Sequence, residues 1–115
     1  MLIWIDTTNP EPIYRQIAAQ VRRAVATGEV GPGDKLPSAR DLAASLEVNM
    51  HTVRQAYAEL QRDGLVDVRR GRGVTVLASA PGRAGAHDLA RALVAEARRH
   101  GLTNSEILDL VEGHL

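Results

Sequence analysis

The sequence predicts a mainly α-helical fold with one small β-hairpin, on the basis of three observations. Apolar residues recur at helical spacing in several separate stretches of the chain. Glycine and proline clusters such as 31–34 separate these stretches and predict turns between them. Two short β-favouring runs, 65–68 and 74–77, flank the glycine-rich segment 69–73. Helices followed by such a hairpin predict a winged helix-turn-helix, and further helical stretches predict a C-terminal helical hairpin.

Composition limits what the chain can hold. Its 115 residues suffice for one compact domain and a short appendage, so we expect no separate ligand-binding domain. Aromatic residues make up only 3% of the chain, and the core must therefore be built from Leu, Val, Ile and Ala. Because a small aliphatic core is marginal alone, we expect a dimer. The absence of cysteine excludes disulfides and thiolate metal sites.

The formal net charge is zero, which by itself argues mildly against nucleic-acid binding. The distribution of charge points the other way. Arg69, Arg70 and Arg72 fall within four residues, and Arg40 and Arg54 belong to the two predicted helices before them. Positive charge is thus concentrated where a winged helix-turn-helix meets DNA.

The sequence lacks the motifs of several common functions. No apolar run approaches the roughly 20 residues of a membrane span, and we expect a cytoplasmic protein that does not enter a membrane. No phosphate-binding loop, zinc-protease motif or nucleophile elbow is present. We therefore expect no enzymatic activity, no cofactor and no metal.

The first two helices have clear boundaries. Apolar residues at helical spacing from Ile13 onwards predict the first helix, which Gly28 ends. Arg22 and Arg23 are expected on its solvated face. Ser38 predicts the cap of the second helix, which runs to about Leu46.

The third predicted helix is the one expected to be exposed. Asn49 is a good N-cap and Gly64 a good stop. One face of this helix is apolar and includes Val53, Ala56, Tyr57 and Leu60. The helical period directs other side chains away from the core, namely His51, Gln55 and Ala58, with Thr52 and Arg54 on the flanks.

The two ends of the chain are less regular. Residues 2–5 are apolar and β-favouring, and are expected to add an edge strand or to pack against a partner. Small residues with Pro81 predict a linker over 78–85. Two amphipathic helices are expected within 86–115, the second capped by Thr103.

Several motifs occur together in the order typical of the GntR family of bacterial transcription regulators, which the chain resembles. They are Leu36-Pro37-Ser38-x-Arg40-x-Leu42-Ala43, Thr52-Val53-Arg54, Ala56-Tyr57, Leu60, Asp63-Gly64-Leu65-Val66 and Gly71-x-Gly73. The opening 12–17, the turn 48–53 and the short tail resemble the YtrA subfamily. The resemblance implies a winged helix-turn-helix DNA-binding domain over 1–77 and a dimerisation tail over 86–115.

The resemblance also implies a function and a set of contacts. The implied function is a sequence-specific transcription regulator, a homodimeric repressor that binds an inverted-repeat operator in double-stranded DNA. The implied DNA contacts are Arg40, Asn49, His51, Thr52, Arg54, Arg70, Gly71 and Arg72. The pair Asn49-Met50 departs from the Ser-Arg of many relatives, so a different sequence preference is expected.

The residues themselves leave alternatives open. Arg40 and Arg54 can each bind a phosphate or the O6 and N7 edge of guanine. Asn49 and Thr52, at a helix start, can cap the helix or bind a phosphate. Because the chain has no net charge, a protein-protein interaction module is the alternative function. The sequence does not indicate any small-molecule effector.

Overall fold

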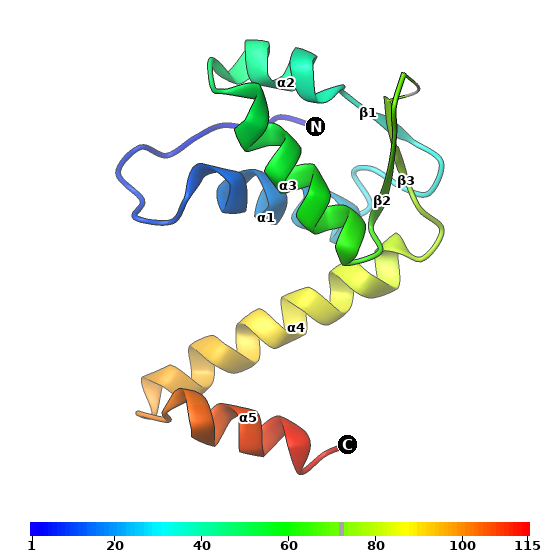
Figure 1. Cartoon of the computed structure of the whole chain (residues 1–115). Coiled ribbons are helices and arrows are strands. Elements are labelled where there is room, and N and C mark those ends of the chain that lie inside the picture. Colours follow the sequence, from blue (N-terminus) through cyan, green and yellow to red (C-terminus); the bar gives the residue numbers. More distant parts are fainter. Residues whose placement is uncertain (72) are drawn as a thin grey trace. The chain divides into compact units, whose positions relative to one another are not determined.

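The computed structural model describes residues 1–71 and 73–115, which divide into two compact units, Met1–Gly85 and Ala86–Leu115. Figure 1 labels the elements in chain order. The first unit contains α1 (Ile13–Ala26), β1 (Lys35–Leu36), α2 (Ala39–Leu46), α3 (Met50–Arg62), β2 (Val66–Arg69) and β3 (Gly73–Val76). The remaining elements are α4 (Ala80–Arg99) and α5 (Asn104–Glu112). The predicted fold class, mainly helical with a small hairpin, is confirmed.

The helices of the first unit begin and end where local side chains satisfy their free backbone groups. The Ser38 hydroxyl accepts a hydrogen bond from the Asp41 amide at 3.1 Å, and the Asn49 carboxamide oxygen accepts one from the His51 amide at 2.8 Å. Gly28 and Gly64 follow the ends of α1 and α3 with φ of +81° and +79°, a left-handed conformation that glycine adopts without strain. The predicted caps and stops are confirmed.

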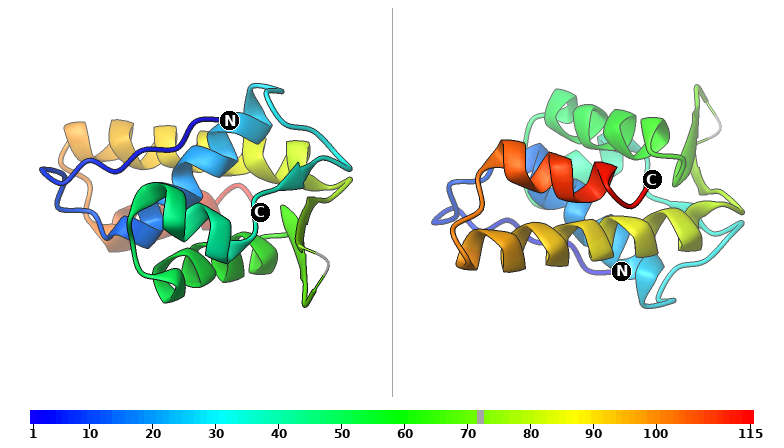
Figure 2. Two further views of the ribbon diagram at one scale, coloured as in Figure 1. Left: turned by 90° about the horizontal axis from the view of Figure 1, so that it is seen from above. Right: turned by 90° about the horizontal axis from the view of Figure 1, so that it is seen from below.

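The core of the first unit forms where α3 packs against α1 and α2 (Figure 2). Its largest fully buried side chains are Tyr57, Ile17, Leu60, Leu65, Val21, Val53, Val66, Val74 and Val76. The Tyr57 hydroxyl donates a hydrogen bond of 2.6 Å to the carbonyl of Pro37, so its polar end is satisfied at the start of α2. The apolar face predicted for α3 is the face that is buried.

The hairpin belongs to a three-stranded antiparallel sheet with strand order β1-β3-β2. β2 pairs with β3, with Val66 opposite Val76 and Arg69 opposite Gly73. The third strand, β1, was not predicted, because its two residues carry no alternating pattern and only their pairing with Val74 and Thr75 makes them a strand. The sheet holds the hairpin against the helices on one side of α3.

The expectation of an edge strand at residues 2–5 is wrong. The backbone amide of Trp4 donates to the side-chain oxygen of Gln20 at 3.1 Å, and the Gln20 amide donates to the Trp4 carbonyl at 2.7 Å. Ile3 is 7% exposed and belongs to the core of the first unit. A glutamine of α1 therefore occupies the backbone groups that a neighbouring strand would use.

The expectation of a linker over 78–85 is wrong for most of that segment, because α4 begins at Ala80. Proline is tolerated in the first turn of a helix, where backbone amides have no partner within the helix, and Pro81 lies in that turn. Ala80 and Ala84 are fully buried in the first unit. Two of the small residues that suggested a loose segment are thus part of the core.

The second unit contains the later part of α4 together with α5. Thr103 and Glu106 form the predicted capping box at the start of α5, with the Thr103 hydroxyl 3.2 Å from the Glu106 amide and the Glu106 carboxylate 3.0 Å from the Thr103 amide. Ala97 and Ile107 are buried. Within the described part of the chain, no helix is sufficiently long and apolar to span a membrane.

Candidate nucleic-acid interface

An open groove of about 960 Å³ lies between the start of α2, one face of α3 and the hairpin. Following the usual term for this fold, we call the hairpin from Val66 to Val76 the wing. The described side chains that line the groove include no acidic residue but five arginines, which are Arg40, Arg54, Arg62, Arg69 and Arg70. In a chain with no net charge, this groove is a strongly positive surface.

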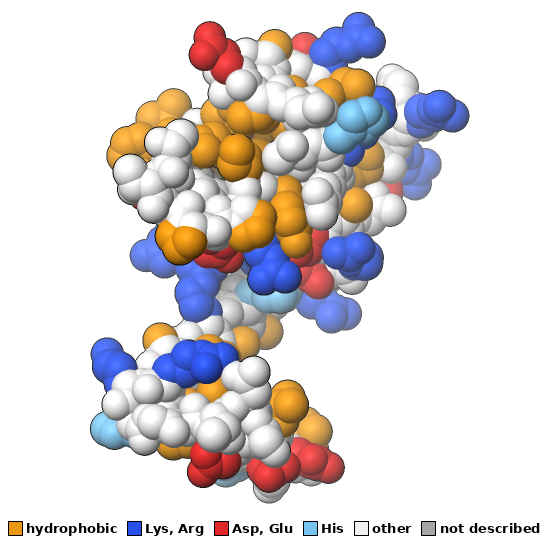
Figure 3. Space-filling model, turned by 60° about the vertical axis from the view of Figure 1, so that its left-hand side comes forward, with side chains coloured by type: hydrophobic (Ala, Val, Ile, Leu, Met, Phe, Trp, Pro, Cys, Tyr) orange, Lys and Arg blue, Asp and Glu red, His pale blue; other side chains and the backbone are white. Residues whose placement is uncertain are grey.

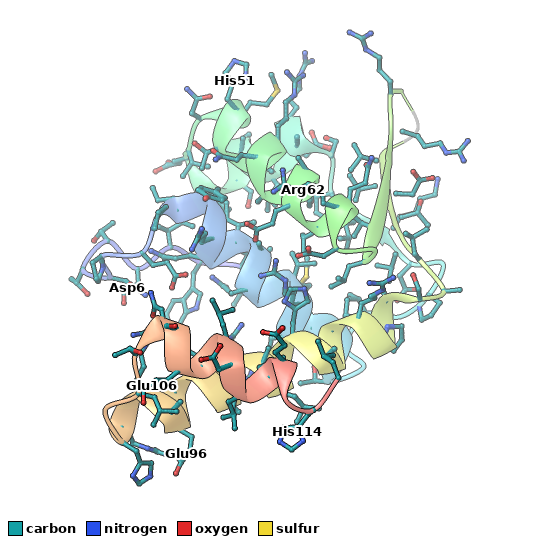
Figure 4. All side chains as sticks on the ribbon, turned by 60° about the horizontal axis from the view of Figure 1, so that its bottom comes forward. Asp6, His51, Arg62, Glu96, Glu106 and His114 are labelled. Carbon is teal, nitrogen blue, oxygen red and sulfur yellow. The ribbon has the colours of Figure 1, made fainter. Side chains whose placement is uncertain are left out.

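The outward face of α3 forms one wall of the groove. Its exposed residues are His51, Arg54, Gln55, Ala58, Gln61 and Arg62. Figure 4 shows His51 at the first turn of α3 and Arg62 at the last, so this face extends along the whole helix. The predicted outward direction of His51, Gln55 and Ala58 is confirmed. The face is polar and faces solvent, as a helix that enters the major groove requires.

Four of the groove arginines are available to bind an external anion. Within the described residues, no hydrogen bond or ion pair is formed by the side chains of Arg40, Arg54, Arg62 and Arg70. The fifth, Arg69, binds the Asp67 carboxylate at 2.8 Å, which raises the pKa of its guanidinium. Free guanidinium groups in one groove suit a polyanion such as a phosphate backbone.

The acidic residues of α3 and its cap are held on another side of the helix. Arg22 of α1 donates to the carboxylates of Glu59 at 2.8 Å and Asp63 at 2.6 Å. The Arg22 side chain is only 12% exposed, so the expectation that it lies on a solvated face is wrong, whereas Arg23 is exposed as expected. Because Arg22 occupies both carboxylates, little of their negative charge opposes the arginines of the groove.

Asn49 and Thr52 lie at the start of α3, and both form hydrogen bonds there. The Asn49 side-chain oxygen is occupied by the His51 amide, and the Thr52 amide donates to the Asn49 carbonyl at 3.0 Å. The capping interpretation of Asn49 is therefore confirmed. Its side-chain NH₂ group and the half-buried Thr52 hydroxyl form no hydrogen bond with the described residues and can meet a phosphate.

Two glycines near the tip of the wing leave its backbone accessible to a ligand. Gly71 has φ of +76° and Gly73 of +81°, and at neither position would a Cβ atom meet another group within 4 Å. Glycine is needed here for its conformation and leaves the backbone open to a ligand. Arg70 is exposed beside them, while the predicted contact Arg72 lies outside the described residues. Figure 3 shows Lys and Arg side chains along one border of the first unit.

The groove residues that sequence reasoning did not assign to the site include Gln61, Arg62 and Val68. Arg62 could have been found, because it follows Arg54 and Ala58 at intervals of four residues and so shares their helix face. Gln61 carries the same signal, because it follows Arg54 by seven residues and Ala58 by three. Val68 has no such signal, since its place in the groove depends on how the wing lies against α3, which local sequence does not encode.

Comparison with known proteins identifies a family for the region that contains this groove. Residues 13–76 match the model of the bacterial regulatory proteins of the gntR family. The HTH-type transcriptional repressor YtrA of Bacillus subtilis (strain 168) is 44% identical over 75 residues, which are 65% of this chain and 58% of that protein. The chain thus spans somewhat more than half the length of this relative.

Two solved structures share the fold. YtrA from Sulfolobus acidocaldarius, a GntR-family transcription factor, is 41% identical with a TM-score of 0.64, over 82% of this chain and 99% of that one. The AraR DNA-binding domain in complex with operator ORE1 is 25% identical with a TM-score of 0.56, over 66% and 93% of the two chains. The family match covers more than half of the chain and includes the groove. The chain belongs to the gntR family of bacterial regulatory proteins, and the matched region folds as a winged helix-turn-helix.

Proposed function

We propose that this regulator is a homodimeric repressor that binds an inverted-repeat operator, with α3 of each subunit in a major groove and the wing on adjacent backbone. The observation that carries the proposal is the groove between α3 and the wing, where every described arginine except Arg69 is unpaired. A dimer of this kind binds half-sites separated by about one helical turn of DNA or a multiple of it.

We infer different roles for the residues in and beside the groove. Arg54, exposed in the second turn of α3, reads a base, and His51 acts at the same end of the helix. Arg40 at the start of α2 and the pair Asn49 and Thr52 bind phosphates. Arginine suits both tasks because its guanidinium binds guanine and phosphate in bidentate geometry.

The wing supplies the remaining contacts. Arg70, Gly71 and Arg72 are proposed to follow the DNA backbone or the minor groove, where negative potential is strongest over narrow A·T-rich sequence. The left-handed conformation of Gly71 supports close approach of the backbone. Contacts of this kind increase affinity for any sequence, whereas contacts from α3 select the sequence.

The zero net charge no longer favours a protein-protein module as the alternative function. That charge combines a groove lined by arginines with carboxylates held elsewhere, as the Arg22 pairs with Glu59 and Asp63 illustrate. Local charge, and not the total, determines attraction to phosphates. No enzymatic activity is proposed, because the described side chains of the groove include no carboxylate and no nucleophile beside a base.

Exposed apolar side chains of the second unit support the dimer. Leu89 is 74% exposed, Leu108 69% and Val111 42%. A unit of this size gains stability if a second copy covers such side chains. We therefore assign dimerisation to the tail, residues 86–115. In the dimer, the tail then sets the distance between the two copies of α3 and between the two wings.

The proposal is tested by enrichment of DNA duplexes from a random-sequence library, followed by binding measurements at increasing salt concentration. We expect a palindromic consensus and an affinity whose logarithm falls linearly with the logarithm of salt concentration. Enrichment of no palindrome, or an affinity independent of salt, would contradict the proposal. In parallel, Leu108→Glu should convert the dimer to a monomer in sedimentation, and Thr103→Ser, in the same tail, should not.

A further inference from the structure

Gln61 connects the wing to α3. It lies in the last turn of α3, and its side-chain oxygen accepts a hydrogen bond of 2.9 Å from the backbone amide of Val68 in β2. Both residues line the groove. Among the described residues, it is the single side-chain hydrogen bond between α3 and β2.

The direction of the Val68 amide follows from the register of the sheet. The Leu77 amide donates to the Leu65 carbonyl at 2.9 Å, and the register places Val68 opposite Val74. Hydrogen-bonded and non-hydrogen-bonded pairs alternate along an antiparallel ladder, so the amide of Val68 points away from β3. β2 is the outer strand of the sheet, and this amide would therefore face solvent if Gln61 did not bind it.

The hydrogen bond between Gln61 and Val68 lies at the last level of the wing that the rest of the first unit supports. On the opposite edge, β1 pairs with β3 as far as Val74, through Leu36. At the level of Val68 and Val74 the hairpin is thus held on both edges, by Gln61 on one side and by Leu36 on the other. Beyond this level only the pair Arg69 and Gly73 precedes the tip. Two-stranded hairpins are marginally stable alone, so the outer part of the wing depends on this last support.

We propose that Gln61 is a positioning residue that holds the wing at a fixed distance from α3, so that Arg54 and Arg70 meet DNA as one preformed surface. This inference rests on the proposed DNA contacts of α3 and the wing. A side chain or loop that is already ordered before binding loses less conformational entropy on binding. Because the bond is exposed and water can replace it, its loss should affect DNA affinity more than folding.

The first test uses the free protein. Gln61→Met keeps the length of the side chain but removes the acceptor, and Gln61→Glu keeps an acceptor oxygen. We expect amide hydrogen exchange at Val68 to accelerate in Gln61→Met and not in Gln61→Glu. The amide of Asp67 faces β3 and serves as an internal control that should not change. Equal acceleration at Asp67, or none at Val68, would overturn the inference.

The second test is a double-mutant cycle on a labelled duplex that the wild-type chain has enriched from a random library. Gln61→Met should weaken binding by about 2- to 10-fold. If Gln61 acts through the wing, the loss caused by Arg70→Ala should shrink in the Gln61→Met background, while the loss caused by Arg54→Ala should stay the same. Additivity with Arg70→Ala, or equal coupling to both arginines, would contradict the positioning role.

The two tests separate this inference from the proposed function. If the wild-type chain enriches no duplex, the proposed function fails, and the connection between Gln61 and the wing is then decided by exchange at Val68 alone. If a duplex is enriched but exchange at Val68 is unchanged in Gln61→Met, the positioning role fails and the proposed function stands.

Discussion

Two faces of α3 use charged side chains in opposite ways. On the side that meets α1, Arg22 binds Glu59 and Asp63 within a largely buried cluster. On the side that meets the groove, Arg54 and Arg62 have no partner in the described part of the chain. Charges paired inside a protein specify how helices pack, and unpaired charges at the surface are available to a ligand. One helix thus serves as a structural element and as a binding surface.

The largest effect should come from the buried face of α3. Leu60 is fully buried, and Leu60→Ala should lower the free energy of unfolding by about 2–5 kcal/mol, because it removes apolar contacts and leaves a cavity. Urea denaturation measures this loss. The matched control is Gln55→Ala on the exposed face, with an expected change within about 0.5 kcal/mol. Similar losses for both variants would remove the distinction between the faces.

The charged cluster should give the next largest effect on stability. Arg22→Ala leaves Glu59 and Asp63 without their shared cation, and we expect a loss of about 2 kcal/mol. Arg23→Ala, at the exposed neighbouring position, should change stability very little. Denaturation of both variants at the same pH measures the difference. If Arg22→Ala is as stable as Arg23→Ala, the cluster does not hold α1 to α3.

The groove face should affect binding and not folding. Arg54→Ala should cost about 1–3 kcal/mol in affinity for the enriched duplex and relax the preference at one position of the operator. Arg70→Ala should weaken binding to specific and unrelated duplexes by the same factor, since the wing is proposed to contact the backbone. Fluorescence anisotropy with both kinds of duplex measures these changes. If both variants lost affinity for the two kinds of duplex in the same way, α3 and the wing would not have separate roles in sequence preference and backbone binding.

The last effect is confined to high pH. Burial raises the pKa of Tyr57 to about 12, above the value of about 10 for an exposed tyrosine. Because the folded state keeps the proton longer than the unfolded state, stability should be unaffected below about pH 10 and fall as pH rises from there to about 12. Unfolding experiments over this range measure the slope. Tyr57→Phe lacks the titrating hydroxyl and should lack this part of the decline.

Much of the first unit could be predicted because its signals are local. Ser38 and Asn49 predicted helix starts that the structure contains, since a cap is decided by the side chain and the next few amides. The helical period likewise gave the buried and exposed faces of α3, which placed His51 and Arg54 outside the core.

The features that could not be predicted depend on residues far apart in the sequence. Arg22 is 37 residues from Glu59, and only the packing of α1 on α3 brings them together. β1 is a strand only because Val74 and Thr75 lie beside it. The start of α4 was not predicted, because Pro81 and two glycines are typical of a linker. In the structure, the buried Ala80 and Ala84 hold this part of the helix in the core.

The most direct test of the two-face account compares two exposed arginines that differ only in where they lie. Arg54→Ala and Arg23→Ala remove the same charge, from the groove and from α1 respectively. The affinity of each variant for the enriched duplex should be measured by fluorescence anisotropy at one low salt concentration. We predict that Arg54→Ala loses at least about fivefold in affinity and Arg23→Ala keeps the wild-type value. Equal losses would mean that total charge, and not the groove beside α3, determines DNA binding.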